Sequence, residues 1–238
     1  MKIGKSESLL VPNGNCYVWR YLTMKKFKRL IDDQALYFCN AKRMSDQYEA
    51  TIPDSTRKNW CKQLREEGYA AADAEREVAA QMARLREASE QTLISCWSLS
   101  PHESYALWKI YLGNQPEGVA IRTTVSRLKS TLQGSAGAEE VYLGQIRYRN
   151  YLNPLKLDHF GIITTKKMFY EFERELRLFI TDNAGVAGLN VGIDLKQLIQ
   201  NVYLSPFVAP GMRETVEGLL ASRGIKADCI SNSEIHDL

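Results

Sequence analysis

Thr92-Leu93-Ile94-Ser95-Cys96-Trp97-Ser98 is the stretch of sequence that decides the fold. Its β-branched, aromatic and apolar residues are typical of a strand, and we predict that this strand lies at the centre of a sheet. The residues that follow, Ser100-Pro101-His102-Glu103, have the pattern of a helix start, with Ser100 as the N-cap and Glu103 at the reciprocal position. Gly113-Asn114 would end this helix.

Similar patterns extend from this centre in both directions along the chain. Further strands are predicted at 17–22, 36–40, 118–122, 141–151, 201–205 and 227–231. Further helices are predicted at 23–31, with Thr23 as the N-cap, and at 125–132 and 213–223. The stretch 170–180 fits both periods, so its pattern does not separate helix from strand. Because strands and helices mix without regular βαβ spacing, we predict an α+β fold with a mixed central sheet and flanking helices.

Residues 55–90 differ in composition from the rest of the chain. They are rich in Ala, Glu, Arg and Lys and contain one glycine, Gly68. This composition predicts a helical hairpin with a solvated face, inserted into the fold as a subdomain or lid. With 238 residues, the chain is long enough for a single domain, 1–238, that carries this insertion.

The composition is ordinary for a globular protein, with 45% apolar and 25% charged residues. No apolar run approaches the roughly 20 residues that cross a bilayer, so we expect no membrane span. The five cysteines are widely spaced, without a CxxC pair or a nearby histidine cluster. We therefore expect no metal site, and we interpret the cysteines as reduced thiols of a cytoplasmic protein.

The positive charge is concentrated near the N-terminus. Residues 1–43 hold nine Lys or Arg and three Asp or Glu, although the formal charge of the whole chain is only +3. We interpret this segment as a contact for the phosphates of DNA. The expected contacts are Lys25, Lys26, Lys28 and Arg29. The alternative is that lysines on a surface helix only keep the protein soluble.

Tyr170–Ile180 carries the densest charge in the chain, because three carboxylates and two arginines alternate with apolar residues. Read as a strand, the stretch would place Glu171, Glu173, Glu175 and Arg177 on one face, exposed to water, a partner or a ligand. A carboxylate can stabilise the cation that forms when an N-glycosidic bond breaks, or orient a water molecule against it. Glu173 and Glu175 are therefore catalytic candidates, and Arg177 on the same face is a candidate for binding the substrate. The alternative is a surface ladder with Arg174 and Arg177.

A second acidic pair, Asp46 and Glu49, lies in a predicted polar turn with Tyr48 between them. We include the two acids as catalytic candidates and Tyr48 as a substrate contact, and the alternative is local capping of the turn. Arg20, followed by Tyr21, is a candidate for binding a phosphate or a carboxylate. An arginine flanked by aromatic residues is also common in a half-buried strand.

Three further groups complete the candidate binding residues. Ser95 and Ser98 end the central strand, where polar side chains often face a cleft. Tyr105, Trp108 and Tyr111 form an aromatic stripe at a spacing of three residues, and Tyr105 or Trp108 could stack a nucleobase. The alternative is that the stripe packs in the core. Familiar enzyme signatures such as GxGxxG, GxSxG and HExxH are missing.

The order of these motifs resembles a large bacterial family that shares a domain of unknown function. The matching blocks are Trp19-Arg20-Tyr21, Leu36-Tyr37-Phe38, Asp46-Gln47-Tyr48-Glu49, Ile94-Ser95-Cys96-Trp97-Ser98, Trp108-Lys109-Ile110-Tyr111, Gly118-Val119-Ala120-Ile121 and Phe172-Glu173-Arg174-Glu175-Leu176-Arg177. Many members have Asn-Asp-Pro where this chain has Ser45-Asp46-Gln47. The resemblance supplies no reaction, but members occur in phage-defence neighbourhoods, which implies a role in antiviral defence.

The chain also resembles ADP-ribosyltransferases of the arginine–serine–glutamate type. These enzymes have an arginine on an early strand, a Ser-x-Ser-like strand and then Glu-x-Glu. Arg20, Ser95–Ser98 and Glu173-Arg174-Glu175 follow this order, although the middle element is Ser-Cys-Trp-Ser. The resemblance implies that NAD is used and that Arg20 holds its pyrophosphate.

Three functions follow from these patterns. The first hypothesis is a DNA glycosylase that removes a modified or foreign base and needs no cofactor. The second is an ADP-ribosyltransferase-like enzyme that uses NAD to modify nucleic acid or protein. The third is a non-catalytic defence sensor or binding module, in which the carboxylates are structural.

Overall fold

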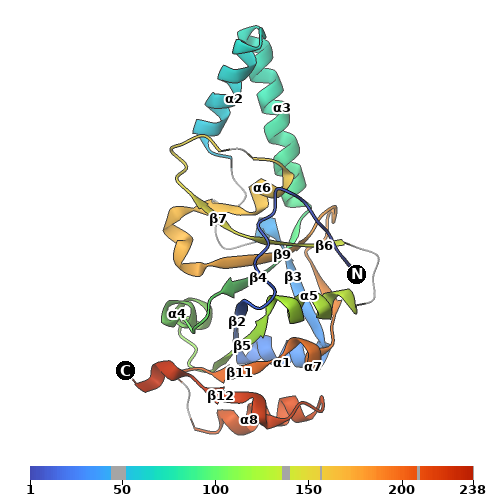
Figure 1. Ribbon diagram of the computed structural model, residues 1–238, viewed down its shortest axis with the longest axis vertical. Coiled ribbons are helices and arrows are strands. Elements are labelled where there is room, and N and C mark those ends of the chain that lie inside the picture. The colour runs from blue at the N-terminus through green and yellow to red at the C-terminus, as the bar shows by residue number, and fades with distance from the viewer. Residues whose placement is uncertain (44–51, 136–139, 156, 208–209, 238) are drawn as a thin grey trace.

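A mixed β-sheet forms the centre of the molecule, and helices cover both of its faces (Figure 1). The computed structural model describes residues 1–43, 52–135, 140–155, 157–207 and 210–237. Within these residues, ten strands join the main sheet and two more, β7 and β8, form a small parallel pair. The strands are Lys2–Ile3 (β1), Tyr17–Thr23 (β2), Ala35–Asn40 (β3), Leu93–Leu99 (β4), Gly118–Thr124 (β5), Glu140–Gln145 (β6), Arg147–Arg149 (β7), Thr165–Lys167 (β8), Glu175–Ile180 (β9), Gly188–Gly192 (β10), Asn201–Leu204 (β11) and Ile230–Asn232 (β12).

The helices connect these strands without a regular alternation. The α-helices are Met24–Asp33 (α1), Asp54–Glu66 (α2), Ala71–Glu90 (α3), Tyr105–Leu112 (α4), Val125–Gln133 (α5), His159–Ile163 (α6), Leu195–Leu198 (α7) and Met212–Ala221 (α8). The 3₁₀-helices are Ala41–Arg43 (η1), Met168–Glu173 (η2), Ala227–Cys229 (η3) and Glu234–Asp237 (η4). Together with the mixed sheet, these elements confirm the predicted α+β fold.

Strand β4 lies at the centre of the sheet, as its sequence predicts. The strand order is β1-β6-β9-β4-β2-β5-β11-β12, and β3 also pairs with β4 and continues to β10. One edge of β4 is fully paired with β9, from Leu93 to Ser98. Its other edge is shared, because Leu93 and Ile94 pair with β3 whereas Ser98 and Leu99 pair with β2. The sheet is therefore split alongside residues 95–97.

The two faces of the sheet are covered by different helices. One face carries the largest apolar core, which β2, β4, β5 and β9 share with α1, α5, α7 and α8. On the other face, Leu107 and Trp108 of α4 pack against Trp19 and Tyr21 of β2. A third cluster there joins α6 to Ile94 of β4 and Phe179 of β9. Burial of this apolar surface is the main stabilising contribution to the fold.

Helices α2 and α3 form the predicted hairpin, which projects from one end of the molecule (Figure 1). Its buried side chains are few, among them Cys61, Ala74 and Val78, and most of its charged residues face water. No helix of the described chain is long and apolar enough to cross a membrane.

The stretch 170–180 is neither one helix nor one strand. Residues up to Glu173 belong to η2, Arg174 adopts a left-handed conformation with φ 44°, and β9 begins at Glu175. The prediction that Glu171, Glu173 and Glu175 share the exposed face of one strand is therefore wrong. Arg174 interrupts the pattern, because its backbone conformation fits neither helix nor strand.

Candidate functional site

A cavity of about 910 Å³ lies where β2 and β3 separate alongside β4. This volume is within the usual range of small-molecule sites. Its walls come from β2, β3 and β4, from α1 and α4, and from β8 and η2. Its charged and amide-bearing lining side chains are Arg20, Lys26, Arg29, Asp33, Lys166, Glu173, Glu175 and Asn190.

Arg20 crosses the split in the sheet. Its Nη1 donates to Ser95 Oγ at 2.6 Å, its Nη2 donates to the carbonyl of Tyr37 at 3.3 Å, and its Cζ lies 5.5 Å from the centre of the Trp97 ring. It forms no ion pair with a carboxylate of the described residues. Burial lowers the pKa of the Arg20 guanidinium below its ordinary value, but arginine remains charged at neutral pH. The cavity therefore contains a fixed positive charge that suits a phosphate or a carboxylate.

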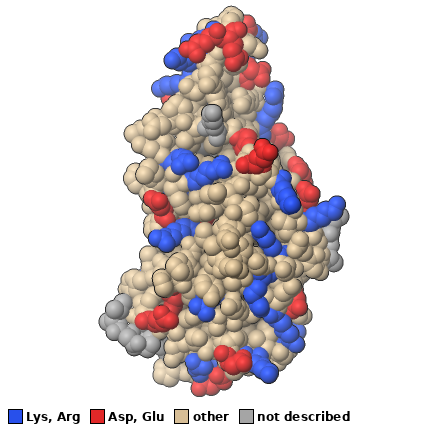
Figure 2. Space-filling model, viewed as in Figure 1, with Lys and Arg blue, Asp and Glu red and all other residues tan. Residues whose placement is uncertain are grey.

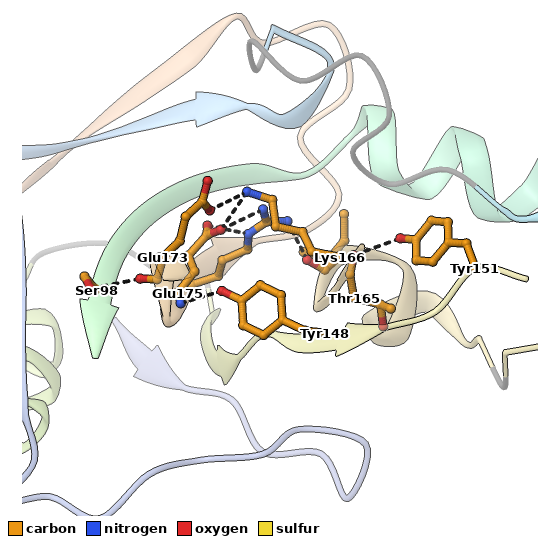
Figure 3. A network of polar contacts seen from close by, with 9 residues as sticks. Ser98, Tyr148, Tyr151, Thr165, Lys166, Glu173 and Glu175 are labelled. Carbon is orange, nitrogen blue, oxygen red and sulfur yellow. Dashed lines mark hydrogen bonds and ion pairs between the residues drawn. The ribbon is translucent and has the colours of Figure 1, made fainter. Parts of the chain in front are cut away.

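Glu175, at the start of the strand β9 that pairs with β4, lies in a buried network of charges. Its Oε1 accepts from Arg177 Nε at 2.7 Å, and its Oε2 accepts from Lys166 Nζ at 3.1 Å (Figure 3). Burial alone would raise the pKa of this carboxyl, but Arg177 and Lys166 outweigh burial and lower it to about 2. Glu175 is only 3% exposed and its oxygens are occupied, so it is a structural anion rather than a free base.

Glu173 is the more accessible of the two glutamates. Its side chain is 19% exposed, lines the cavity and accepts from Lys166 Nζ at 2.7 Å (Figure 3). Its backbone carbonyl accepts from Ser98 Oγ at 2.9 Å, which holds the end of η2 against β4. A carboxylate fixed in this way can face a developing cation without a large rearrangement.

Lys166 is a site residue that the sequence did not reveal. It is 6% exposed and contacts both glutamates from β8. A double lysine at Lys166-Lys167 gives no local sign that one ammonium is buried.

Tyr111 was considered only as part of the aromatic stripe, but it lines the cavity and stacks on Tyr21 with ring centres 6.1 Å apart.

The structure brings many of the predicted site residues together. The lining residues among them are Arg20, Tyr21, Lys26, Arg29, Ser95, Ser98, Glu173 and Glu175. Tyr21 is buried and contributes mainly its ring, because its hydroxyl accepts from the backbone N–H of Ser104 at 2.8 Å. Arg177 was expected to bind substrate, and this expectation is wrong. It is 1% exposed, and it donates to Glu175 and to the carbonyl of Ile163.

The prediction that Tyr105 and Trp108 stack a nucleobase is also wrong. Trp108 is fully buried, and its Nε1 donates to Glu103 Oε2 at 2.9 Å, so its ring is not available to a base. Tyr105 is exposed but does not line the cavity, and its ring packs edge-on against Phe207. A stripe with this spacing has one buried side, and Trp108 lies on it.

The predicted phosphate contacts divide into two groups. Lys26 and Arg29 line the cavity, whereas Lys25 and Lys28 do not. Lys28 pairs with Asp32 at 2.5 Å and Arg29 with Asp33 at 3.3 Å, which reduces the positive potential of α1. On the face in Figure 2, basic and acidic side chains are interspersed. Asp46, Tyr48 and Glu49 lie outside the described residues.

Comparison with known proteins gives no identification. No family model, no curated protein and no solved structure matches the chain. Among the described residues, no group of three or more His, Cys, Asp or Glu side chains is arranged to hold a metal ion. None of the five cysteines, all of which lie in the described part of the chain, forms a disulfide, and Cys96 lines the cavity.

Proposed function

We propose that the protein is an enzyme that binds a phosphate-bearing nucleotide in this cavity and breaks its N-glycosidic bond. The observation that carries the proposal is the convergence of Arg20, Ser95 and Glu173 on one cavity. Arg20 and Glu173 are more than 150 positions apart in the sequence, but all three residues lie on or beside the neighbouring strands β2, β4 and β9. Arg20, which pairs with no carboxylate of the described residues, supplies an anion site, and the carboxylate of Glu173 can stabilise a cation.

The proposed roles follow from the surroundings of each group. Arg20 is held by Ser95 and Tyr37, so its remaining N–H groups can bind phosphate oxygens in a fixed direction. Glu173 faces the ribose C1′, which becomes positively charged as the bond breaks. Lys166 holds the carboxylate of Glu173 in place, and Glu175 together with Arg177 holds Lys166.

NAD is the substrate that these surroundings favour. The cavity of about 910 Å³ lies near the upper end of the range for ligand sites, which suits a dinucleotide. In the proposed reaction, the bond from ribose C1′ to the nicotinamide nitrogen breaks and its electron pair stays on nicotinamide. A nucleophile then forms a bond to C1′ and loses its proton. Water as the nucleophile gives ADP-ribose, and another acceptor gives an ADP-ribosylated product.

A DNA glycosylase is the second candidate, because Lys26 and Arg29 line the cavity and could contact a nucleic-acid backbone. The same glutamate would then stabilise the deoxyribose cation of an extruded nucleotide. This candidate is less favoured, because Tyr105 and Trp108, which were expected to stack the base, do not line the cavity. Whichever substrate is used, an antiviral role remains a proposal based on the family resemblance.

The test is incubation of the purified protein with NAD, followed by chromatographic measurement of free nicotinamide. We expect nicotinamide release by the wild type and a loss of about 100-fold or more for Glu173→Gln. Glu171→Gln is the matched control, because Glu171 lies on η2 but does not line the cavity.

Parallel assays of abasic sites in DNA that contains modified bases separate the two enzymes. Abasic sites without nicotinamide release would replace the NAD proposal by the glycosylase. The absence of both products, with nucleotide binding that Glu173→Gln leaves unchanged, would overturn the enzymatic proposal and favour the sensor or binding module.

A further inference from the structure

Helix η2 exposes aromatic side chains next to the cavity. Phe169 is 86% exposed and Phe172 is 47% exposed. A 3₁₀-helix has three residues per turn, so residues three apart lie on the same side of it. Phe172 also lines the cavity. The two rings therefore form a short aromatic path that leads from the surface to the cavity.

Basic side chains border this path. The parallel strands β7 and β8 place Arg149 opposite Lys167. Lys167 directly precedes η2, and Arg174 directly follows it. Arg149 and Arg174 are exposed, and neither forms an ion pair with a described acidic residue. Residues 147–149 and 165–174 contain five Lys or Arg and two Glu. We name Arg149, Lys167, Phe169, Phe172 and Arg174 the η2 surface.

The combination of exposed rings and cations identifies the kind of partner. Single-stranded nucleic acid offers bases that stack on aromatic rings and phosphates that attract cations. Bases in a duplex are already stacked and paired, so they cannot use the rings in this way. An apolar protein partner would use the rings but would leave Arg149 and Arg174 without a complementary charge.

We propose that the η2 surface binds single-stranded nucleic acid and presents it to the cavity as the acceptor of ADP-ribose. The binding itself does not require the proposed function, whereas the transfer rests on it. In the transfer, a nitrogen or oxygen of the strand forms a bond to ribose C1′. The bond from C1′ to nicotinamide breaks with its electrons on nicotinamide, and the acceptor proton passes to Glu173 or to water.

The test measures fluorescence anisotropy of labelled single-stranded DNA, single-stranded RNA and duplex DNA without NAD, at several salt concentrations. We expect single strands to bind more tightly than the duplex, with affinity that falls as salt rises. The double variant Phe169→Ala/Phe172→Ala should weaken single-strand binding at least tenfold. The double variant Arg149→Gln/Arg174→Gln should also weaken it and should reduce its salt dependence.

The matched control is Tyr69→Ala/Arg86→Gln, which removes an exposed ring and an exposed cation from the α2–α3 hairpin, outside the η2 surface. It should bind single strands as the wild type does. Thermal unfolding of each variant checks that these surface changes leave the fold intact.

Equal binding by the aromatic variant and the control, or no preference for single strands, would overturn the proposal. Strand binding as expected but without nicotinamide release would support the η2 surface and contradict the NAD reaction. Nicotinamide release without strand binding would overturn this inference and leave the NAD reaction standing.

Discussion

Replacement of Glu175 by glutamine tests the buried network that supports the site. The substitution keeps the shape of the side chain but removes the negative charge beside Arg177 and Lys166. Both cations are nearly inaccessible to water, with side-chain exposures of 1% and 7%. Water therefore compensates little of the lost charge. Removing one partner of a buried ion pair typically costs about 3–5 kcal/mol.

The pKa of Glu175 gives an independent magnitude and a pH dependence. The difference between the ordinary value of 4.5 and the folded value of about 2 corresponds to about 3 kcal/mol. A lowered carboxyl pKa stabilises the folded protein above the unfolded pKa, and this contribution is lost as the pH falls through the folded pKa. Roughly two thirds of the contribution should be lost by pH 3.

The assay is urea unfolding of the wild type and Glu175→Gln at neutral pH and at several values between pH 5 and pH 3. We expect a difference in unfolding free energy of about 3 kcal/mol at neutral pH that shrinks below pH 5. Glu171→Gln serves as the control, because Glu171 is exposed and should change stability by less than about 0.5 kcal/mol. A cost below about 1 kcal/mol at neutral pH, or a difference that does not change with pH, would refute the reasoning.

Three further predictions concern the anion site at Arg20, the apolar core and the start of helix α4. Arg20→Lys should weaken ADP binding about tenfold or more in calorimetry, because lysine lacks the planar fork that binds two oxygens, and unchanged affinity would contradict the role of Arg20. Phe27→Ala should lower the unfolding free energy by about 3–5 kcal/mol in urea, because Phe27 is fully buried on α1; a loss under 1 kcal/mol would contradict its place in the core. Ser104→Ala should cost about 1 kcal/mol in the same measurement, because its Oγ accepts from the backbone N–H of Leu107 at the start of α4; a neutral result would show that this cap contributes nothing.

Local signals in the sequence predict many of the elements well. Thr23 was expected to cap a helix, and its side chain accepts from the backbone N–H of Lys26 at the start of α1. The central strand was predicted at 92–98 and is found at Leu93–Leu99. Such signals succeed because strand composition and a capping hydroxyl act over a few neighbouring residues.

Long-range contacts explain where a local signal failed. Ser100 and Glu103 were expected to form a capping box, but α4 begins at Tyr105 with Ser104 as its cap. Glu103 instead accepts from Ser233 Oγ at 2.7 Å, a partner 130 residues away. A pattern of four residues contains no information about a contact of this kind.

The candidate site was predictable in its residue types but not in its organisation. Arg20, Ser95 and Glu173 could be selected because each is a polar residue in or beside an apolar stretch. Their convergence depends on the order of β2, β4 and β9, which no local pattern specifies. Lys166 could not be selected, because only the fold places its ammonium between two carboxylates.

The most direct measurement is a crystal structure of the protein with a non-hydrolysable NAD analogue. The predicted result is a pyrophosphate that accepts hydrogen bonds from the guanidinium of Arg20, with the ribose C1′ roughly 3.5 Å from the carboxylate of Glu173. An analogue bound away from the cavity, or bound inside it with C1′ remote from Glu173, would contradict the proposed enzyme.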